Sequence, residues 1–294
     1  MDLYVRLALL SHTTDIVLTY YSVEGVATIG IAIIGYFLVI GFPDTMLASG
    51  RRQGFTTQEL EIVLDRIDRD RRDSRPDKLT WPKFLTHVAN WELWVYGFMF
   101  LTCSAPIYAF AYFIQIILGT IVDSTAQVFL LCAPPYLFSI IWTAGCAWLA
   151  DRSRLRMPWM IGNAAITLMG LLITAYSTNS GARYFGVFLG VSGCNANLPT
   201  IIAFQSNNVR SDSRRSVANG IQFLFAAIGG IYASTTFMQK EYPTYRTGVW
   251  CGVATQFLLI LLCTGMFLHF KRRNRAANEG REVIQEEESF RHTF

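Results

Sequence analysis

The sequence predicts an all-α membrane protein, a helical bundle of about seven transmembrane helices. The chain has 294 residues, of which 52% are hydrophobic and only 16% charged, a balance too apolar for a soluble domain of this size. Its apolar runs reach about 20 residues, the length that a helix needs to cross a hydrocarbon core of about 30 Å. Lipid offers no partner for a free backbone amide, and the runs lack the alternation of barrel strands, so each is expected to be a helix.

The runs divide the chain into five parts. An atypical segment, 1–19, precedes the first expected helix, 20–40, and a polar segment, 41–92, follows it. Six further helices are expected within 93–269, before a polar tail, 270–294. Their bounds are 93–118, 127–150, 157–176, 184–204, 217–237 and 248–269.

The polar segment carries its own helix signal. Thr56 and Glu59 have the spacing of a capping box, in which each side chain bonds the backbone of the other residue. The helix that follows has one apolar stripe, formed by Leu60, Val63, Leu64 and Ile67. We expect this amphipathic helix to lie along the cytoplasmic face of the membrane.

Basic residues predict the orientation. Of the 25 lysines and arginines, 21 lie in the loops and tail on one side of the expected helices, and only Arg6, Arg183, Lys240 and Arg246 lie on the other. The richer side is expected to be cytoplasmic, which puts the N-terminus outside and the C-terminus in the cytoplasm. The net charge of +4 is therefore a topology signal and does not indicate a nucleic-acid partner.

Enzyme chemistry is not expected. The six cysteines all fall inside apolar runs, where they behave as small hydrophobic residues. The four histidines are scattered, and no metal, nucleophile or phosphate-loop spacing is present. We expect no catalytic residues, no metal and no cofactor.

Several phrases resemble a known family. The chain is similar to the fungal anion:cation symporters, the allantoate permease-like branch of the major facilitator superfamily. The matching phrases are Val23-Glu24-Gly25-Val26, Gly41-Phe42-Pro43-Asp44, Phe55-Thr56-Thr57-Gln58-Glu59, Pro134-Pro135-Tyr136, Ala150-Asp151-Arg152, Asn207 with Arg214-Arg215, Gly229-Gly230-Ile231 and Tyr242-Pro243 with Tyr245-Arg246-Thr247-Gly248. The chain departs from the superfamily signature at Ala147, Arg154 and Leu155, where two glycines and a basic residue are expected.

The resemblance implies the C-terminal part of a major facilitator fold. Segment 20–40 would be equivalent to the sixth helix of the family, and 93–269 to its second six-helix bundle. It further implies a multi-pass protein, of the plasma membrane, that carries a small organic anion such as a vitamin or carboxylate, with a proton as a candidate coupling ion. The partners are then the substrate, the lipid bilayer and a missing N-terminal bundle.

Polar side chains inside the expected helices are candidates for a substrate cavity, since such groups are costly in lipid. Ser104, Tyr108, Tyr112 and Gln115 share one helical face because they recur at intervals of four, four and three residues. The other candidates are Tyr136, Ser139, Ser192 and Asn195. The alternative for each is an interhelical hydrogen bond without a role in binding.

A second group of residues is predicted to take part in gating. Pro134 and Pro135 remove two backbone donors in the middle of an expected helix, which either supplies a gating kink or a static bend. The charged candidates for a latch between neighbouring loops are Asp151, Arg152, Arg156, Arg214 and Arg215. These arginines could instead only set the topology.

Three functional hypotheses remain at this stage. The first is a secondary transporter that rocks helical bundles around a midplane site. The second is a non-transporting half-transporter fragment, or a membrane interaction protein, because alternating access needs two bundles. The third is a seven-helix receptor, and the long first cytoplasmic loop argues against it.

Overall fold

The computed structural model describes residues 22–50, 54–70, 77–119, 122, 124–236, 241, 245–285 and 290–294. They belong to two compact units, Met1–Arg72 and Asp73–Phe294. The predicted segment 1–19 lies outside the described residues.

The first unit contains an apolar helix, Ser22–Leu38, followed by α2, Pro43–Ser49, and α3, Thr57–Asp70. The predicted capping box is present at the start of α3. The Thr56 N–H donates to Glu59 Oε2 at 2.8 Å, and the Glu59 N–H donates to Thr56 Oγ1 at 3.3 Å. The Thr56 N–H and the Thr56 hydroxyl, which both donate to Oε2, hold the pKa of the exposed Glu59 carboxyl below its usual value.

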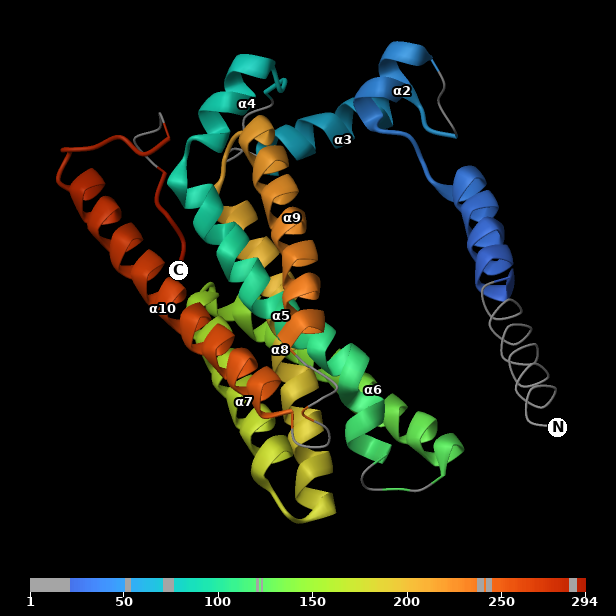
Figure 1. Cartoon of the computed structure of the whole chain (residues 1–294). Helices are drawn as coiled ribbons and strands as arrows, with labels where there is room; N and C mark the ends of the chain where they lie inside the picture. The colour runs from blue at the N-terminus through green and yellow to red at the C-terminus, as the bar shows by residue number, and fades with distance from the viewer. Residues whose placement is uncertain are drawn as a thin grey trace. The chain divides into compact units, whose positions relative to one another are not determined.

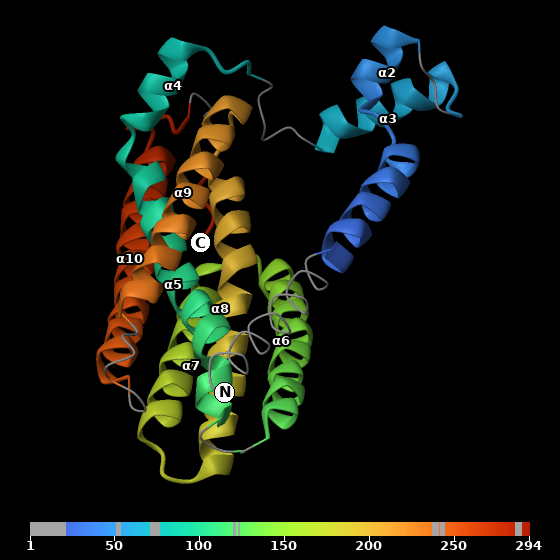
Figure 2. The same cartoon turned by 45° about the vertical axis from the view of Figure 1, so that its right-hand side comes forward.

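Among its described residues, the second unit has a short helix and six long ones (Figures 1 and 2). The short helix is α4, Trp81–Val88. The long helices are α5, Trp91–Gly119; α6, Thr125–Ser153; α7, Met157–Tyr176; α8, Ser180–Asn208; α9, Asp212–Thr236; and α10, Arg246–Asn278. Each of the six is long and apolar enough to cross a membrane. With the shorter apolar helix Ser22–Leu38 of the first unit, they confirm the prediction of about seven apolar helices.

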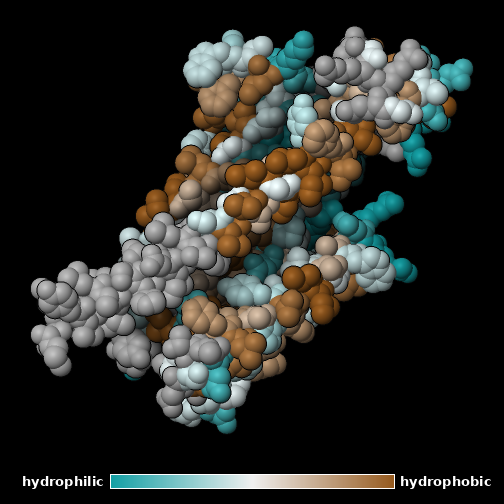
Figure 3. All heavy atoms as spheres, turned by 90° about the vertical axis from the view of Figure 1, so that its right-hand side faces the viewer, coloured by the Kyte–Doolittle hydropathy of each residue, from teal (hydrophilic) through white to brown (hydrophobic). Residues whose placement is uncertain are grey.

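In the second unit α8 packs against α5, α6 and α7, while α5 also packs against α9 and α10. Glycines allow α7 and α8 to come close, since a Cβ added at Gly170 would lie 2.3 Å from the backbone nitrogen of Gly190. A core of large side chains, among them Tyr96, Phe204 and Phe270, fills one half of the bundle. Hydrophobic side chains also cover much of the visible surface, as expected for helices that face lipid or other helices (Figure 3).

Helix α6 ends in a left-handed turn. Its C-cap residue is Arg154, with φ 54° and ψ 18°, and the Arg154 N–H donates to the Asp151 carbonyl at 3.3 Å. Glycine is the usual residue in this conformation because it has no Cβ. The structure therefore gives a physical reason for the glycine that the superfamily signature has at this position.

Candidate functional site

The polar stripe predicted on α5 extends from a buried end to an exposed one. Ser104 is buried, donates its hydroxyl to the Leu101 carbonyl at 3.1 Å, and packs against Gly229 of α9. Tyr108 and Tyr112 stack on each other, with ring centroids 6.0 Å apart. Tyr112 is 52% exposed, and Gln115 is exposed as well. The stripe thus begins in the α5–α9 interface and opens toward the surface.

The α6 candidates lie on a helix that continues through both of its prolines, Pro134 and Pro135. Tyr136 is half-buried against a second hydrophobic core, and Ser139 is buried. Between this helix and α8 lies an aromatic contact, Phe138 with Phe188, at a centroid distance of 5.7 Å. The prolines therefore do not end α6.

The α8 candidates differ in their surroundings. Ser192 is buried, and its hydroxyl has no hydrogen-bond partner among the described residues. Asn195 is half-buried. By contrast, Asn197, two residues on, is fully buried and donates to the Met160 carbonyl of α7 at 3.2 Å. Asn197 therefore joins two helices, whereas Asn195 stays on the less covered side of α8.

The structure brings only some of these candidates together. Tyr108 and Tyr112 are in contact. Within the described part of the chain, no hydrogen bond or ring contact joins them to Tyr136 or Asn195. The α5, α6 and α8 candidates are consequently a set of polar side chains on neighbouring helices and do not form one closed pocket.

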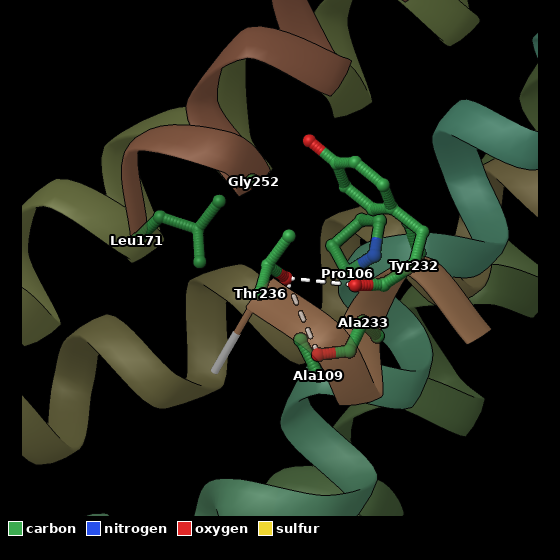
Figure 4. Close-up of a pocket in the computed structure, with 8 residues that line it drawn as sticks. Pro106, Ala109, Leu171, Tyr232, Ala233, Thr236 and Gly252 are labelled. Atoms are coloured by element: carbon green, nitrogen blue, oxygen red, sulfur yellow. Dashed lines mark hydrogen bonds between the residues drawn. The ribbon is translucent and has the colours of Figure 1, made fainter. Parts of the chain in front are cut away.

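A small cavity lies between α5, α7, α9 and α10 (Figure 4). Its volume of about 10 Å³ has room for roughly one water molecule. Pro106, Leu171 and Gly252 line it, and the Thr236 hydroxyl beside it donates to the carbonyls of Tyr232 at 2.9 Å and Ala233 at 3.2 Å. It is too small for an organic substrate.

A larger groove, of about 380 Å³, lies between α4, α5 and α9. Its walls are almost entirely apolar, with Phe84 from α4, Trp94 from α5 and Leu224 from α9 among them, and Ser216 as the one polar side chain. Such a lining offers no charge to an anion.

The predicted latch residues lie at one end of the bundle, where α5 and α9 begin and α8 and α10 end. We call it the basic end. Arg156 pairs with Asp151 at 2.6 Å, across the turn between α6 and α7. The Arg152 guanidinium lies over the Trp148 ring, 5.4 Å from its centroid. Arg215 donates to the carbonyls of Ser206 and Val209, each at 3.0 Å, and so satisfies the end of α8.

Arg214 pairs with an acid that the sequence analysis did not select. Glu92, in the first turn of α5, is 5% exposed and accepts from Arg214 of α9 at 2.6 Å. It also accepts from Arg273 at 2.9 Å and lies 3.3 Å from His269 Nε2, both on α10. A single acid at the start of a long apolar helix was the available signal, because helix N-termini favour carboxylates. Three helices meet at this one carboxylate.

The chain after α10 folds back onto the same end. The His292 ring stacks on Phe270, with centroids 4.0 Å apart and planes at 4°. The Asn208 side chain, at the end of α8, bonds both His292 and Thr293. Burial lowers the pKa of the His292 imidazole to about 4; the positive charges of Arg273 and Arg214 act in the same direction, while Glu92 opposes them.

A smaller polar cluster ties α4 to α9. The Ser213 hydroxyl donates to Asp77 Oδ2 at 2.7 Å and lies 2.9 Å from His87 Nε2. Hydrogen bonds from Lys83 and Ser213 lower the pKa of Asp77, and burial lowers the pKa of His87. Over the described ranges, no group of three histidine, cysteine, aspartate or glutamate side chains could hold a metal ion.

Comparison with known proteins assigns the chain to a family of transporters. Residues 8–234 match the family model described as Major Facilitator Superfamily. A high-affinity nicotinic acid transporter of Saccharomyces cerevisiae is 24% identical over 220 residues, which are 75% of this chain and 41% of that protein. The MFS transporter prlL of a fungal species is 21% identical over 259 residues, 87% of this chain and 51% of that protein.

An uncharacterized transporter of Schizosaccharomyces pombe is 25% identical over 229 residues, 78% of this chain and 45% of that protein. The chain thus spans about half, or less, of the length of these curated relatives. The family model covers well over half of the chain. From its apolar helices and this match, the chain is an integral, multi-pass membrane protein that belongs to the Major Facilitator Superfamily.

Proposed function

We propose that this chain is part of a secondary transporter that moves a small organic anion, such as a vitamin or a carboxylate, across the membrane. The family membership supports transport as the activity. The anion is suggested by the relative named as a nicotinic acid transporter and by the resemblance to the fungal anion:cation symporters. A proton is the proposed coupling ion, and the plasma membrane the proposed location.

The observation on which the proposal depends is the pair of stacked tyrosines on α5. Tyr108 and Tyr112 stand in a helix that is otherwise strongly apolar, and Tyr112 is 52% exposed. Phenol hydroxyls at membrane depth are costly unless they have a partner, and a carboxylate accepts hydrogen bonds from them well. Asn195 of α8 and Tyr136 of α6 are the proposed additional donors.

We also propose a layout for the chain. Segment 20–40 would be the equivalent of the sixth family helix, 41–92 a cytoplasmic central loop, 93–269 the second bundle and 270–294 a cytoplasmic tail. In this layout the basic end faces the cytoplasm, in agreement with the distribution of lysine and arginine. The proposed gate lies there, at Asp151, Arg156 and Arg214.

Uptake by reconstituted protein tests the proposal. Purified full chain would be placed in proteoliposomes and given radiolabelled nicotinic acid and a panel of small carboxylates at inside pH 7.5 and outside pH 6. Tyr112→Phe removes one hydroxyl and is expected to lower uptake at least about tenfold, the effect of losing one hydrogen bond to a charged group. Tyr176→Phe is the matched control, because Tyr176 is 53% exposed and lies on α7.

A second candidate is favoured by one observation, the partial coverage of the relatives. In this alternative the chain does not transport alone and acts as a membrane interaction partner. The same liposomes would distinguish the two candidates if a matched sample held this chain together with the first five helices of the yeast nicotinic acid transporter. No uptake in either sample would support the second candidate, uptake only in the combined sample would support a role as one part of a transporter, and equal uptake in both would exclude the second candidate.

A further inference from the structure

Three of the long helices contain proline in their interior: Pro106 in α5, the pair Pro134 and Pro135 in α6, and Pro199 in α8. A proline has no N–H, so the carbonyl four residues earlier in the helix loses its normal partner. In lipid such a carbonyl cannot turn to water, and another donor must be found. The carbonyls concerned include Thr102, four residues before Pro106, and Leu131, four residues before Pro135.

The Thr102 carbonyl receives its hydrogen bond from another helix. The side-chain amide of Gln256, on α10, donates to it at 3.0 Å. Both residues are fully buried. Gln256 therefore supplies the donor that Pro106 lacks.

The Leu131 carbonyl is satisfied in the same way. The Tyr184 hydroxyl, at the start of α8, donates to it at 3.1 Å. Tyr184 is half-buried and packs edge-on against Phe188, with ring centroids 5.0 Å apart. Two different helices thus use a side chain of a neighbour to replace a proline's missing donor.

Space beside Pro106 completes the arrangement. The cavity of about 10 Å³ is lined by Pro106 and, on α10, by Gly252 (Figure 4). Gly252 lies four residues before Gln256, so both are on the same face of α10. Helix α5 consequently has a small cavity beside the ring of Pro106, and the freed Thr102 carbonyl accepts one side-chain hydrogen bond, from Gln256. A change of bend there has to break only that side-chain bond, and the backbone ladder stays intact.

We propose that Gln256 and Tyr184 are positioning residues that set the bend of α5 and α6 by holding the carbonyls of Thr102 and Leu131. Each donor fixes its helix in the conformation seen here and releases it when the helix bends. The role in a transport cycle rests on the proposed function, whereas the replacement of the missing donor does not. The experiment therefore separates the two.

A double-mutant cycle with Pro106→Ala measures the replacement of the donor. Gln256→Met has similar volume and no donor, so it is expected to lower the thermal midpoint of the detergent-solubilised full chain by several degrees. In the Pro106→Ala background a backbone N–H is restored, and Gln256→Met should leave the midpoint unchanged or raise it. An equal drop in both backgrounds would show that Gln256 only fills space, and would overturn the proposal.

The matched control for this cycle is Gln222→Met. Gln222 on α9 is equally buried, and its amide nitrogen has no hydrogen-bond partner among the described residues. Its replacement should therefore have the same effect with proline or alanine at 106. If the effect of Gln222→Met on the thermal midpoint depended on residue 106 as strongly as that of Gln256→Met, the coupling between Gln256 and Pro106 would not be specific.

Tyr184→Phe with Pro135→Ala forms the second, milder cycle. Tyr184→Phe removes only one oxygen atom, so this cycle can still be measured if Gln256→Met does not fold. We expect a lower midpoint for Tyr184→Phe alone and a much smaller change in the Pro135→Ala background. Additive effects would overturn the proposal for α6.

Uptake kinetics test the role in the cycle. Tyr184→Phe and Gln256→Met should change the turnover number at least threefold with little change in KM, and each proline-to-alanine partner should shift it back. If the double-mutant cycles show coupling in the thermal midpoint but the variants keep the turnover number of the parent chain, the role in transport is refuted. The bond to the carbonyl then remains established. Coupled midpoints in a chain without any uptake would instead refute the proposed function.

Discussion

Glu92 and Arg214 form an ion pair of 2.6 Å that joins the first turn of α5 to the first turn of α9. Arg273 of α10 binds the other carboxylate oxygen at 2.9 Å and continues to Glu282 at 2.7 Å. The pair is thus the centre of a charge network that ties three helix ends to the segment after α10. Its members are separated by 122 and 181 residues in the sequence, so it depends on the fold and not on local spacing.

Replacing this carboxylate is expected to destabilise the bundle. Glu92→Gln keeps the shape but leaves Arg214 without its anion, whereas Arg273 keeps Glu282, and breaking a buried ion pair typically costs about 3 kcal/mol or more. Thermal or denaturant unfolding of the purified chain would show the loss. Glu279→Gln is the control, because Glu279 pairs with Arg275 at the surface, where the cost should stay below about 1 kcal/mol. Similar losses for both variants would contradict the central role of Glu92.

The close contact of α7 and α8 predicts a strong effect of a single methyl group. At Gly170 an added Cβ would meet the backbone of Gly190 at 2.3 Å, which cannot be relieved by a side-chain rotation. Gly170→Ala should therefore push the helices apart and destabilise the chain by roughly 2 kcal/mol. Gly162→Ala on the same helix meets nothing within 4 Å and should be neutral or slightly stabilising. The yield of monodisperse protein and its thermal midpoint would compare them.

The docked C-terminal segment should be released when its anchor is removed. The Asn208 amide donates to Thr293 and accepts from the Thr293 N–H at 2.9 Å and from His292. Asn208→Leu is expected to speed tryptic cleavage after Arg291 roughly tenfold, the equivalent of about 1.4 kcal/mol of lost docking energy. Asn179→Ala is a useful control, because it removes the cap at the other end of α8. Unchanged cleavage in Asn208→Leu would show that the segment is held by other contacts.

Docking of the same segment should depend on pH. Because burial lowers the pKa of His292 to about 4, the docked imidazole stays neutral while a released one, with a pKa of about 6.5, takes up a proton. Docking is therefore unaffected above pH 6.5 and weakens as the pH falls from 6.5 toward 4. The thermal midpoint should drop between pH 7.5 and pH 5, and His292→Phe should remove most of that drop while keeping the stack on Phe270. A drop of the same size in this variant would assign the pH dependence to other groups.

Much of the fold could be predicted because its causes are local. Runs of about 20 apolar residues have to be helices in lipid, and the capping box at Thr56 and Glu59 depends on residues three positions apart. The expectation that Pro134 and Pro135 remove two backbone donors from α6 also followed from local geometry. That the partner of the Leu131 carbonyl would be Tyr184, 53 residues later, could not be predicted.

The site could be predicted less well, because buried polar groups are sorted by tertiary contacts. Asn195 and Asn197 look alike in the sequence, yet only Asn197 bonds α7. Glu92 lies one residue before the apolar run that was expected to begin at 93, so it looked like part of a loop. Its burial comes from α9 and α10, which a single helix pattern does not show.

Arg154 affects both the backbone of the turn, through its left-handed conformation, and the topology of the chain, through its charge. Holding a residue with a Cβ in this conformation costs roughly 1 kcal/mol compared with glycine, so a change to glycine would make the turn between α6 and α7 easier to form. The same change would remove a positive charge from a short link, and such charges favour retention of a loop on the side where insertion begins. Arg154→Gly would therefore make the turn easier to form and would weaken the signal that orients this loop in the bilayer.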